Sequence, residues 1–92
     1  MMDLELGRLR DEIERVDTSL IELIARRVAL ARDIGVAKRA LQLPTLDHAR
    51  EAAVVRRAVD VARAAGLTCD DDIRQIFWQL IGLSRRAQQD EA

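Results

Sequence analysis

The feature that most constrains this chain is a long stretch of helical periodicity near its N-terminus. From about Leu6 to Gln42 there is no proline, and apolar or small side chains recur at steps of three and four residues. This spacing predicts one amphipathic helix, roughly 55 Å long at about 1.5 Å per residue. The positions of its apolar seam are Leu6, Leu9, Ile13, Val16, Leu20, Leu23, Leu30, Ile34, Ala37 and Leu41.

The predicted helix is too long for the domain that this chain could build alone. A compact domain of this length has a diameter of only about 32 Å, from the usual scaling of radius of gyration with chain length. Part of the apolar seam would therefore remain uncovered in a single chain, and it needs a surface from another molecule. The sequence predicts a dimer for this reason.

The remainder of the chain also has helical character. Pro44 disfavours helix at the residue before it, so it is expected to end the long helix. Gly66 suits the position just after a helix end, and Thr68 to Asp72 supply capping and acidic residues for another helix start. No stretch shows the alternation of a strand. We therefore predict one all-α domain over residues 1–92, with helices over about 5–42, 46–65 and 69–89.

Composition excludes several classes of function. The chain has 15 Lys and Arg against 16 Asp and Glu, so no strong positive field favours nucleic acid or anionic lipid. The single cysteine, Cys69, allows no intrachain disulfide and no multi-cysteine metal site. The acidic N-terminus does not resemble a secretory signal, and no apolar run approaches the ~20 residues of a membrane span. We expect a cytoplasmic protein.

Two cations interrupt the apolar face of the long helix. Arg27 and Lys38 are eleven residues apart, which places them within about 20° on one face and ~16 Å apart along the axis. Ala31, Ile34 and Gly35 lie between or beside them. Small side chains between two cations predict a hollow that suits a compact anion.

Polar residues also interrupt the apolar pattern of the shorter helices. Ser84 and Gln88 lie one turn apart and continue the apolar stripe of the third helix. Asp47, Arg50 and Glu51 fall within one turn at the start of the second. Taken singly, each has an ordinary structural explanation as a cap, a back-bonded hydroxyl or a solvated charge. Their combination favours a binding site.

Arg10 does not share the face of the other cations. It precedes Arg27 by 17 residues, about 25 Å and roughly 100° away on the same helix. If Arg10 serves the same hollow, it must come from a partner chain. His48 has no second ligand at metal-binding spacing, and Arg85 and Arg86 are most simply interpreted as solvated.

With these residues in place, the chain resembles the all-helical chorismate mutases. The likeness covers about residues 6 to 88. It rests on Leu9–Ile13, Val16–Asp17, Leu23–Arg27, Ile34–Lys38, Pro44, Asp47, Arg50–Glu51, Ser84 and Gln88. The resemblance implies an intertwined homodimer in which the long helices of two subunits pack together, and each active site takes one arginine from the neighbouring subunit.

The resemblance also implies roles for individual residues. Arg10 matches the arginine supplied in trans, and Arg27 matches the arginine that binds a substrate carboxylate within its own chain. Lys38 matches the lysine that contacts both a carboxylate and the ether oxygen. Gln88 matches the side chain on the other side of that oxygen.

Four further positions match the remainder of the family's pocket. Asp47 and Glu51 match groups around the ring hydroxyl, Arg50 a supporting arginine, and Ser84 a carboxylate donor. Arg85 departs from the pattern, because an aliphatic wall residue is expected there.

The implied reaction is the Claisen rearrangement of chorismate to prephenate, in phenylalanine and tyrosine biosynthesis. It is unimolecular and needs no nucleophile, proton transfer, metal or cofactor. An enzyme accelerates it by holding the substrate in a compact conformer and by placing donors around the ether oxygen. Arginine suits the two carboxylates of the substrate, while Lys38 and Gln88 suit the ether oxygen.

Two other functions remain open at this point. The first is isochorismate-pyruvate lyase on the same fold, although Glu51 and the length of the Lys38–Pro44 loop favour the mutase. The second is a non-catalytic helical module that docks onto another enzyme of the shikimate pathway. An intact set of pocket residues argues against a purely structural role, and it is compatible with docking alongside catalysis.

Overall fold

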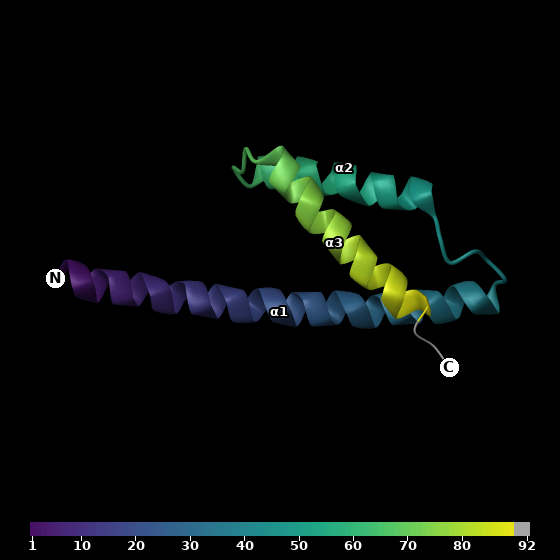
Figure 1. Cartoon of the computed structure of the whole chain (residues 1–92), viewed down its shortest axis with the longest axis horizontal. Helices are drawn as coiled ribbons and strands as arrows, with labels where there is room; N and C mark the ends of the chain where they lie inside the picture. The colour runs from purple at the N-terminus through teal and green to yellow at the C-terminus, as the bar shows by residue number, and fades with distance from the viewer. Residues whose placement is uncertain (90–92) are drawn as a thin grey trace.

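A computed structural model describes residues 1–89, which form three α-helices and no strand. They are α1 (Met2–Ala40), α2 (His48–Ala64) and α3 (Asp70–Gln89). The predicted all-α class is confirmed. In Figure 1, α1 is a straight rod, and α3 runs diagonally from α2 to the C-terminal half of α1.

The long helix begins and ends a few residues earlier than the sequence predicted. It ends at Ala40 because Gln42 adopts a left-handed backbone conformation with φ 58°. The amide of Leu43 then donates to the carbonyl of Lys38 at 2.8 Å, and the amide of Gln42 donates to that of Arg39 at 3.1 Å. This pair of bonds is a Schellman motif. The chain therefore leaves the helix before it reaches Pro44, so the expectation that Pro44 ends it was wrong.

Both ends of α2 have the signals that the sequence predicted. The side chain of Asp47 caps the N-terminus, since its Oδ1 accepts a hydrogen bond from the amide of Arg50 at 3.0 Å. Gly66 has a φ of +89°, and the amide of Leu67 donates to the carbonyl of Ala62 at 2.9 Å. The cap fixes the first turn of α2, where two candidate site residues lie.

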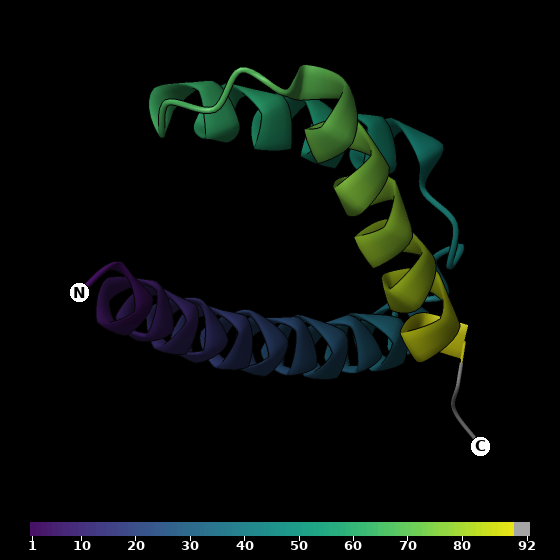
Figure 2. The same ribbon diagram turned by 60° about the vertical axis from the view of Figure 1, so that its left-hand side comes forward.

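Helix α3 packs against both other helices, whereas α1 and α2 do not pack on each other within the described chain. The residues buried between them are mostly small, which allows the helices to approach closely. They are Ala31, Gly35, Val55, Ala58, Val59, Ala62, Ile81 and Ala87. Figure 2 shows the result, in which α3 bridges two helices that lie on opposite sides of the molecule.

The N-terminal half of α1 extends beyond the rest of the molecule. The molecule measures 61 × 29 × 16 Å, with a radius of gyration of 17.0 Å, against about 12 Å for a compact domain of this length. The seam residues Leu6, Leu9, Ile13, Val16, Leu20 and Leu23 are between 43% and 61% exposed. Despite the length of α1, no helix among the described residues is apolar enough to cross a membrane.

This exposed seam predicts that folding and dimerisation occur together. The midpoint of thermal unfolding should rise with chain concentration, with each tenfold increase stabilising the dimer by about 1.4 kcal/mol. In addition, Ile13→Glu should strongly destabilise a dimer that buries this side chain, yet it should be nearly neutral in a monomer. Calorimetry at several concentrations measures both effects. A midpoint that does not depend on concentration would contradict this prediction.

Candidate active site

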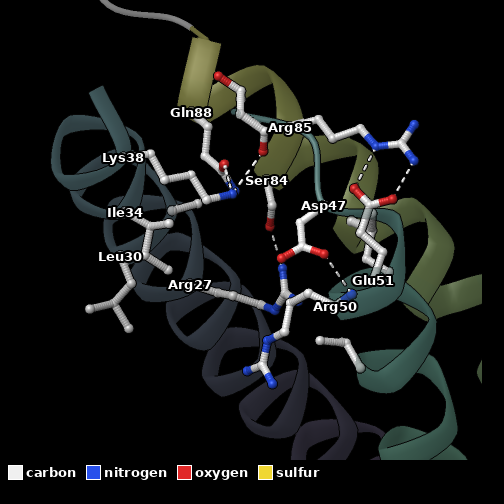
Figure 3. A pocket seen from close by; sticks show the side chains of 14 residues that line it. Arg27, Leu30, Ile34, Lys38, Asp47, Arg50, Glu51, Ser84, Arg85 and Gln88 are labelled. Carbon is white, nitrogen blue, oxygen red and sulfur yellow. Dashed lines mark hydrogen bonds and ion pairs between the residues drawn. The ribbon is translucent and has the colours of Figure 1, made fainter. Parts of the chain in front are cut away.

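One cavity of about 390 Å³ opens between the three helices, a size typical of sites for small ligands. Figure 3 shows it from close by, with α1 contributing one wall and α2 and α3 the others. Its lining residues are Arg27, Leu30, Ala31, Ile34, Lys38, Thr45, Asp47, Arg50, Glu51, Val54, Ile81, Ser84, Arg85 and Gln88.

Seven of the eight candidate site residues line this cavity. They are Arg27, Lys38, Asp47, Arg50, Glu51, Ser84 and Gln88. Arg10 is the exception, since it is exposed on α1 and is not among the lining residues. Its separation from Arg27 along a straight helix, about 25 Å, excludes a contact with the same ligand within one chain.

Arg27 is held in place by groups of α3. Its Nη1 donates to the hydroxyl oxygen of Ser84 and, at 3.3 Å, to the carbonyl of Leu80. The Ser84 hydroxyl in turn donates to the same Leu80 carbonyl at 3.1 Å. Its single proton is therefore engaged, and Ser84 would have to rotate before it could donate to a ligand carboxylate. In this arrangement Ser84 orients Arg27.

Lys38 and Gln88 form the opposite end of the cavity. The ammonium of Lys38 donates to the carbonyl of Thr45 at 2.7 Å and to Oε1 of Gln88 at 3.0 Å. An ammonium has three protons and no acceptor, so one N–H of Lys38 remains for a ligand. Because the amide oxygen of Gln88 accepts this bond, the amide nitrogen of Gln88 keeps its two N–H donors for a ligand. Figure 3 shows both side chains converging from α1 and α3.

The backbone at Gln88 is fixed by two further residues of α1. Arg39 donates from Nη1 to the Gln88 carbonyl at 2.7 Å. A Cβ at Gly35 would lie 2.6 Å from the same carbonyl oxygen, a distance that real side chains do not tolerate. Glycine therefore allows α3 to pass directly over α1. The prediction that Gly35 lies beside the hollow was wrong, because Gly35 lies under the helix crossing, whereas Ala31 and Ile34 line the cavity.

On the side of α2, an ion pair closes the cavity. Arg85 donates from Nε to Oε2 of Glu51 at 2.8 Å and from Nη2 to Oε1 at 2.5 Å. The hydrogen bond from Arg85 holds the pKa of Glu51 below its ordinary value, although burial of the carboxylate acts in the opposite direction. The interpretation of Arg85 as a solvated residue was therefore wrong. The His48 side chain is largely exposed, and its Nδ1 lies 3.6 Å from Oε1 of Glu51.

Several residues that shape this site carry no signal in the sequence. Thr45 contributes a backbone carbonyl, which any residue could supply, and Arg39 acts on a backbone atom of Gln88. Leu30 and Val54 look like ordinary apolar helix residues in the sequence. Only the i to i+4 relation of Ile81 and Arg85 signalled that Arg85 shares the face of the lining residues.

The comparison with protein families agrees with this geometry. The family model described as chorismate mutase type II matches residues 9–89 of the chain. The chain belongs to this family. The matched range contains every residue that lines the cavity and also Arg10.

Individual relatives support membership of the chorismate mutase type II family over parts of the chain. The T-protein of Enterobacter agglomerans is 36% identical and matches 79% of this chain and 20% of its own length. The 3-dehydroquinate dehydratase of Pyrobaculum aerophilum is 42% identical, over 90% of this chain and 24% of its own length. The intracellular chorismate mutase of Mycolicibacterium smegmatis is 36% identical, over 67% of this chain and 60% of its own. The chain thus spans less than two thirds of each of these relatives.

Proposed function

We propose that this chain is a chorismate mutase, which rearranges chorismate to prephenate on the route to phenylalanine and tyrosine. The observation that carries this proposal is the charge of the cavity. Four cationic side chains and two carboxylates line it, a net charge of +2, which complements a small dicarboxylate. The cationic residues are Arg27, Lys38, Arg50 and Arg85, and the carboxylates are Asp47 and Glu51.

The inventory of donors supports a role in binding both carboxylates. Arg27 uses one nitrogen for Ser84 and Leu80, so its other N–H groups can bind a carboxylate, as a guanidinium does best. Lys38 already donates to Thr45 and Gln88 and keeps one proton for a third acceptor, so its positive charge attracts the second carboxylate while that proton faces the ether oxygen. A dianion held between these groups is confined to a compact conformer, in which the two carbon atoms that must bond lie close together.

The same inventory supports electrostatic catalysis. As the ether C–O bond breaks, negative charge grows on its oxygen. Lys38 and the amide nitrogen of Gln88 are donors fixed on two different helices, so they can stabilise that charge with little reorganisation. The rearrangement is concerted and has no proton transfer. Glu51 and Asp47 are therefore assigned to the ring hydroxyl, and Arg50 supports them.

The proposed active enzyme is a homodimer in which Arg10 of each chain completes the site of the other. This follows from the uncovered apolar seam of α1 and from the separation of Arg10 and Arg27 along it. We also propose a cytoplasmic location, in keeping with the intracellular chorismate mutases among its relatives. Docking onto another enzyme of the shikimate pathway stays a prediction.

The test is product identification with the chain of residues 1–92. Incubation with chorismate should cause loss of its ultraviolet absorbance and the appearance of prephenate, which nuclear magnetic resonance identifies directly. Incubation with isochorismate should release little pyruvate. Pyruvate from isochorismate without prephenate from chorismate would instead establish the lyase, and turnover of neither would leave a non-catalytic binding module.

A further inference from the structure

The residue that departs most clearly from the expected pocket is Arg85. Its guanidinium makes two parallel hydrogen bonds to the carboxylate of Glu51, through Nε at 2.8 Å and Nη2 at 2.5 Å. The two residues are 34 positions apart in sequence and belong to α3 and α2. In Figure 3 the Arg85 side chain extends away from Gln88 and reaches over to Glu51. This pair is a cross-link between two walls of the cavity.

A paired contact of this kind fixes the plane of a carboxylate as well as its distance. Two parallel N–H donors match the two carboxylate oxygens, whereas a single ammonium leaves the group free to rotate. A carboxylate has about four lone-pair positions, of which Arg85 occupies two. The Glu51 side chain is 14% exposed and that of Arg85 is 40% exposed. Glu51 therefore keeps acceptor positions for a ligand, while its partner reaches toward solvent.

The pair also removes an electrostatic problem. The side chains that contact Glu51 are Arg85 of α3 and, more distantly, His48, whose Nδ1 is 3.6 Å from Oε1 of Glu51. The other charged groups of the cavity are Asp47 and Arg50 on the same wall and Arg27 and Lys38 on α1. Without Arg85, the carboxylate of Glu51 would have only the largely exposed His48 beside it and would face a ligand that carries two carboxylates. Like charges held close together in a partly enclosed site repel each other. Arg85 neutralises this charge without occupying all of its acceptor positions.

We propose that Arg85 is a positioning residue, which holds Glu51 as an oriented acceptor for the substrate's ring hydroxyl and so makes the site selective for substrates with that hydroxyl. The proposal rests on the proposed function, because the hydroxyl is that of chorismate. The physical reason for selectivity is that a fixed acceptor, once desolvated, loses a hydrogen bond to any ligand that cannot donate.

The first experiment compares Arg85→Met and Arg85→Lys with the wild type, and Arg86→Met is the matched control because Arg86 does not line this cavity. In Arg85→Met, KM for chorismate should rise on the order of tenfold with kcat little changed, as expected when one hydrogen bond to a charged group is weakened. Arg85→Lys keeps the positive charge but loses the pair of parallel N–H donors, so its KM should lie between those of the wild type and Arg85→Met. Arg86→Met should behave as the wild type.

Selectivity provides a readout that loss of stability would not move. Chorismate with its ring hydroxyl converted to a methyl ether cannot donate to Glu51. The wild type should discriminate against this analogue on the order of tenfold or more in kcat/KM, and Arg85→Met should lose most of that discrimination. In acid, below about pH 5, kcat/KM of Arg85→Met should fall more than that of the wild type, because its Glu51 becomes protonated at a higher pH.

The decisive comparison is the double variant Arg85→Met with Glu51→Gln. If Arg85 acts through Glu51, the double variant should match Glu51→Gln alone in KM and in discrimination. An Arg85→Met effect that persists in full in the Glu51→Gln background would overturn the proposal, as would an Arg85→Met protein with wild-type KM, selectivity and pH profile. Circular dichroism checks that each variant is folded.

A measurement without substrate separates this inference from the proposed function. The carboxyl carbon of Glu51, labelled with carbon-13 and assigned by its loss in Glu51→Gln, should titrate at a higher pH in Arg85→Met than in the wild type. A wild-type protein that does not turn over chorismate would remove the proposed function while leaving this shift intact. Identical titrations in the two proteins would overturn the assigned role of Arg85.

Discussion

Replacing Gln88 with glutamate is expected to convert an enzyme with a nearly flat pH profile into one that works mainly in acid. The wild-type amide donates a hydrogen bond at every pH, and Glu51 stays ionised because Arg85 lowers its pKa. We therefore expect wild-type turnover to change little from about pH 5 to 8, because neither the amide of Gln88 nor the ionised carboxylate of Glu51 changes its protonation state there. A carboxyl group at position 88 could donate to the ether oxygen only while it is protonated.

The geometry strengthens this expectation. Oε1 of Gln88 already accepts from Lys38 at 3.0 Å, so an ionised carboxylate in its place would bind the ammonium more tightly and draw it away from the substrate. It would also repel the charge that grows on the ether oxygen. Activity of the variant should therefore fall steadily as the pH rises above about 5, where an ordinary glutamate is ionised.

Gln88→Ala is the companion variant. It should be poor at every pH, losing about 3 kcal/mol of transition-state stabilisation by analogy with an oxyanion-hole donor. The measurement is the pH dependence of kcat for the three proteins. If the glutamate variant is as active at pH 8 as at pH 5, Gln88 does not donate to the ether oxygen.

The second large effect concerns two arginines that lie 17 residues apart on α1, Arg10 and Arg27. Arg27→Ala and Arg10→Ala should each lower kcat/KM by roughly a hundredfold or more, the size expected when one partner of a desolvated charge pair is removed. For Arg27 the reason is visible in one chain, because it lines the cavity. For Arg10 the loss is expected only if a second chain brings it there.

Arg8→Ala is the matched control for the Arg10 variant. Arg8 lies on the same exposed part of α1, where it pairs with Glu5 and Glu12 at the surface. Exposed pairs of this kind contribute little to stability, so Arg8→Ala should keep wild-type activity. Equal activity of the Arg8 and Arg10 variants, both close to the wild type, would show that each site is complete within one chain.

Much of this fold could be predicted from the sequence because its signals are local. A seam with steps of three and four residues predicts a helix wherever it occurs, and Gly66 or Asp47 marks a helix end through its own backbone or side chain. The end of α1 is different. Gln42 takes the left-handed conformation usually left to glycine, and nothing in its side chain predicts this, so Pro44 looked like the stronger signal.

The same distinction between local and long-range signals applies to the candidate site. Arg27 and Lys38 could be brought together from helical spacing alone, since one rigid helix fixes their separation. The contacts that needed the structure are those between helices. Nothing in the sequence predicts that Arg85 pairs with Glu51, or that Gly35 lies beneath the backbone of Gln88. These depend on the angle at which α3 crosses α1 and α2, which periodicity does not specify.

The measurement that tests the central claim most directly is recovery of activity when the Arg10→Ala and Arg27→Ala proteins are unfolded and refolded together. In a mixed dimer, one site inherits both substitutions and the other inherits neither. Random reassociation makes about half of the dimers mixed, each with one intact site of two, so about a quarter of wild-type prephenate formation should return. No recovery, with mixed dimers demonstrated by mass spectrometry, would contradict an active site shared between two chains.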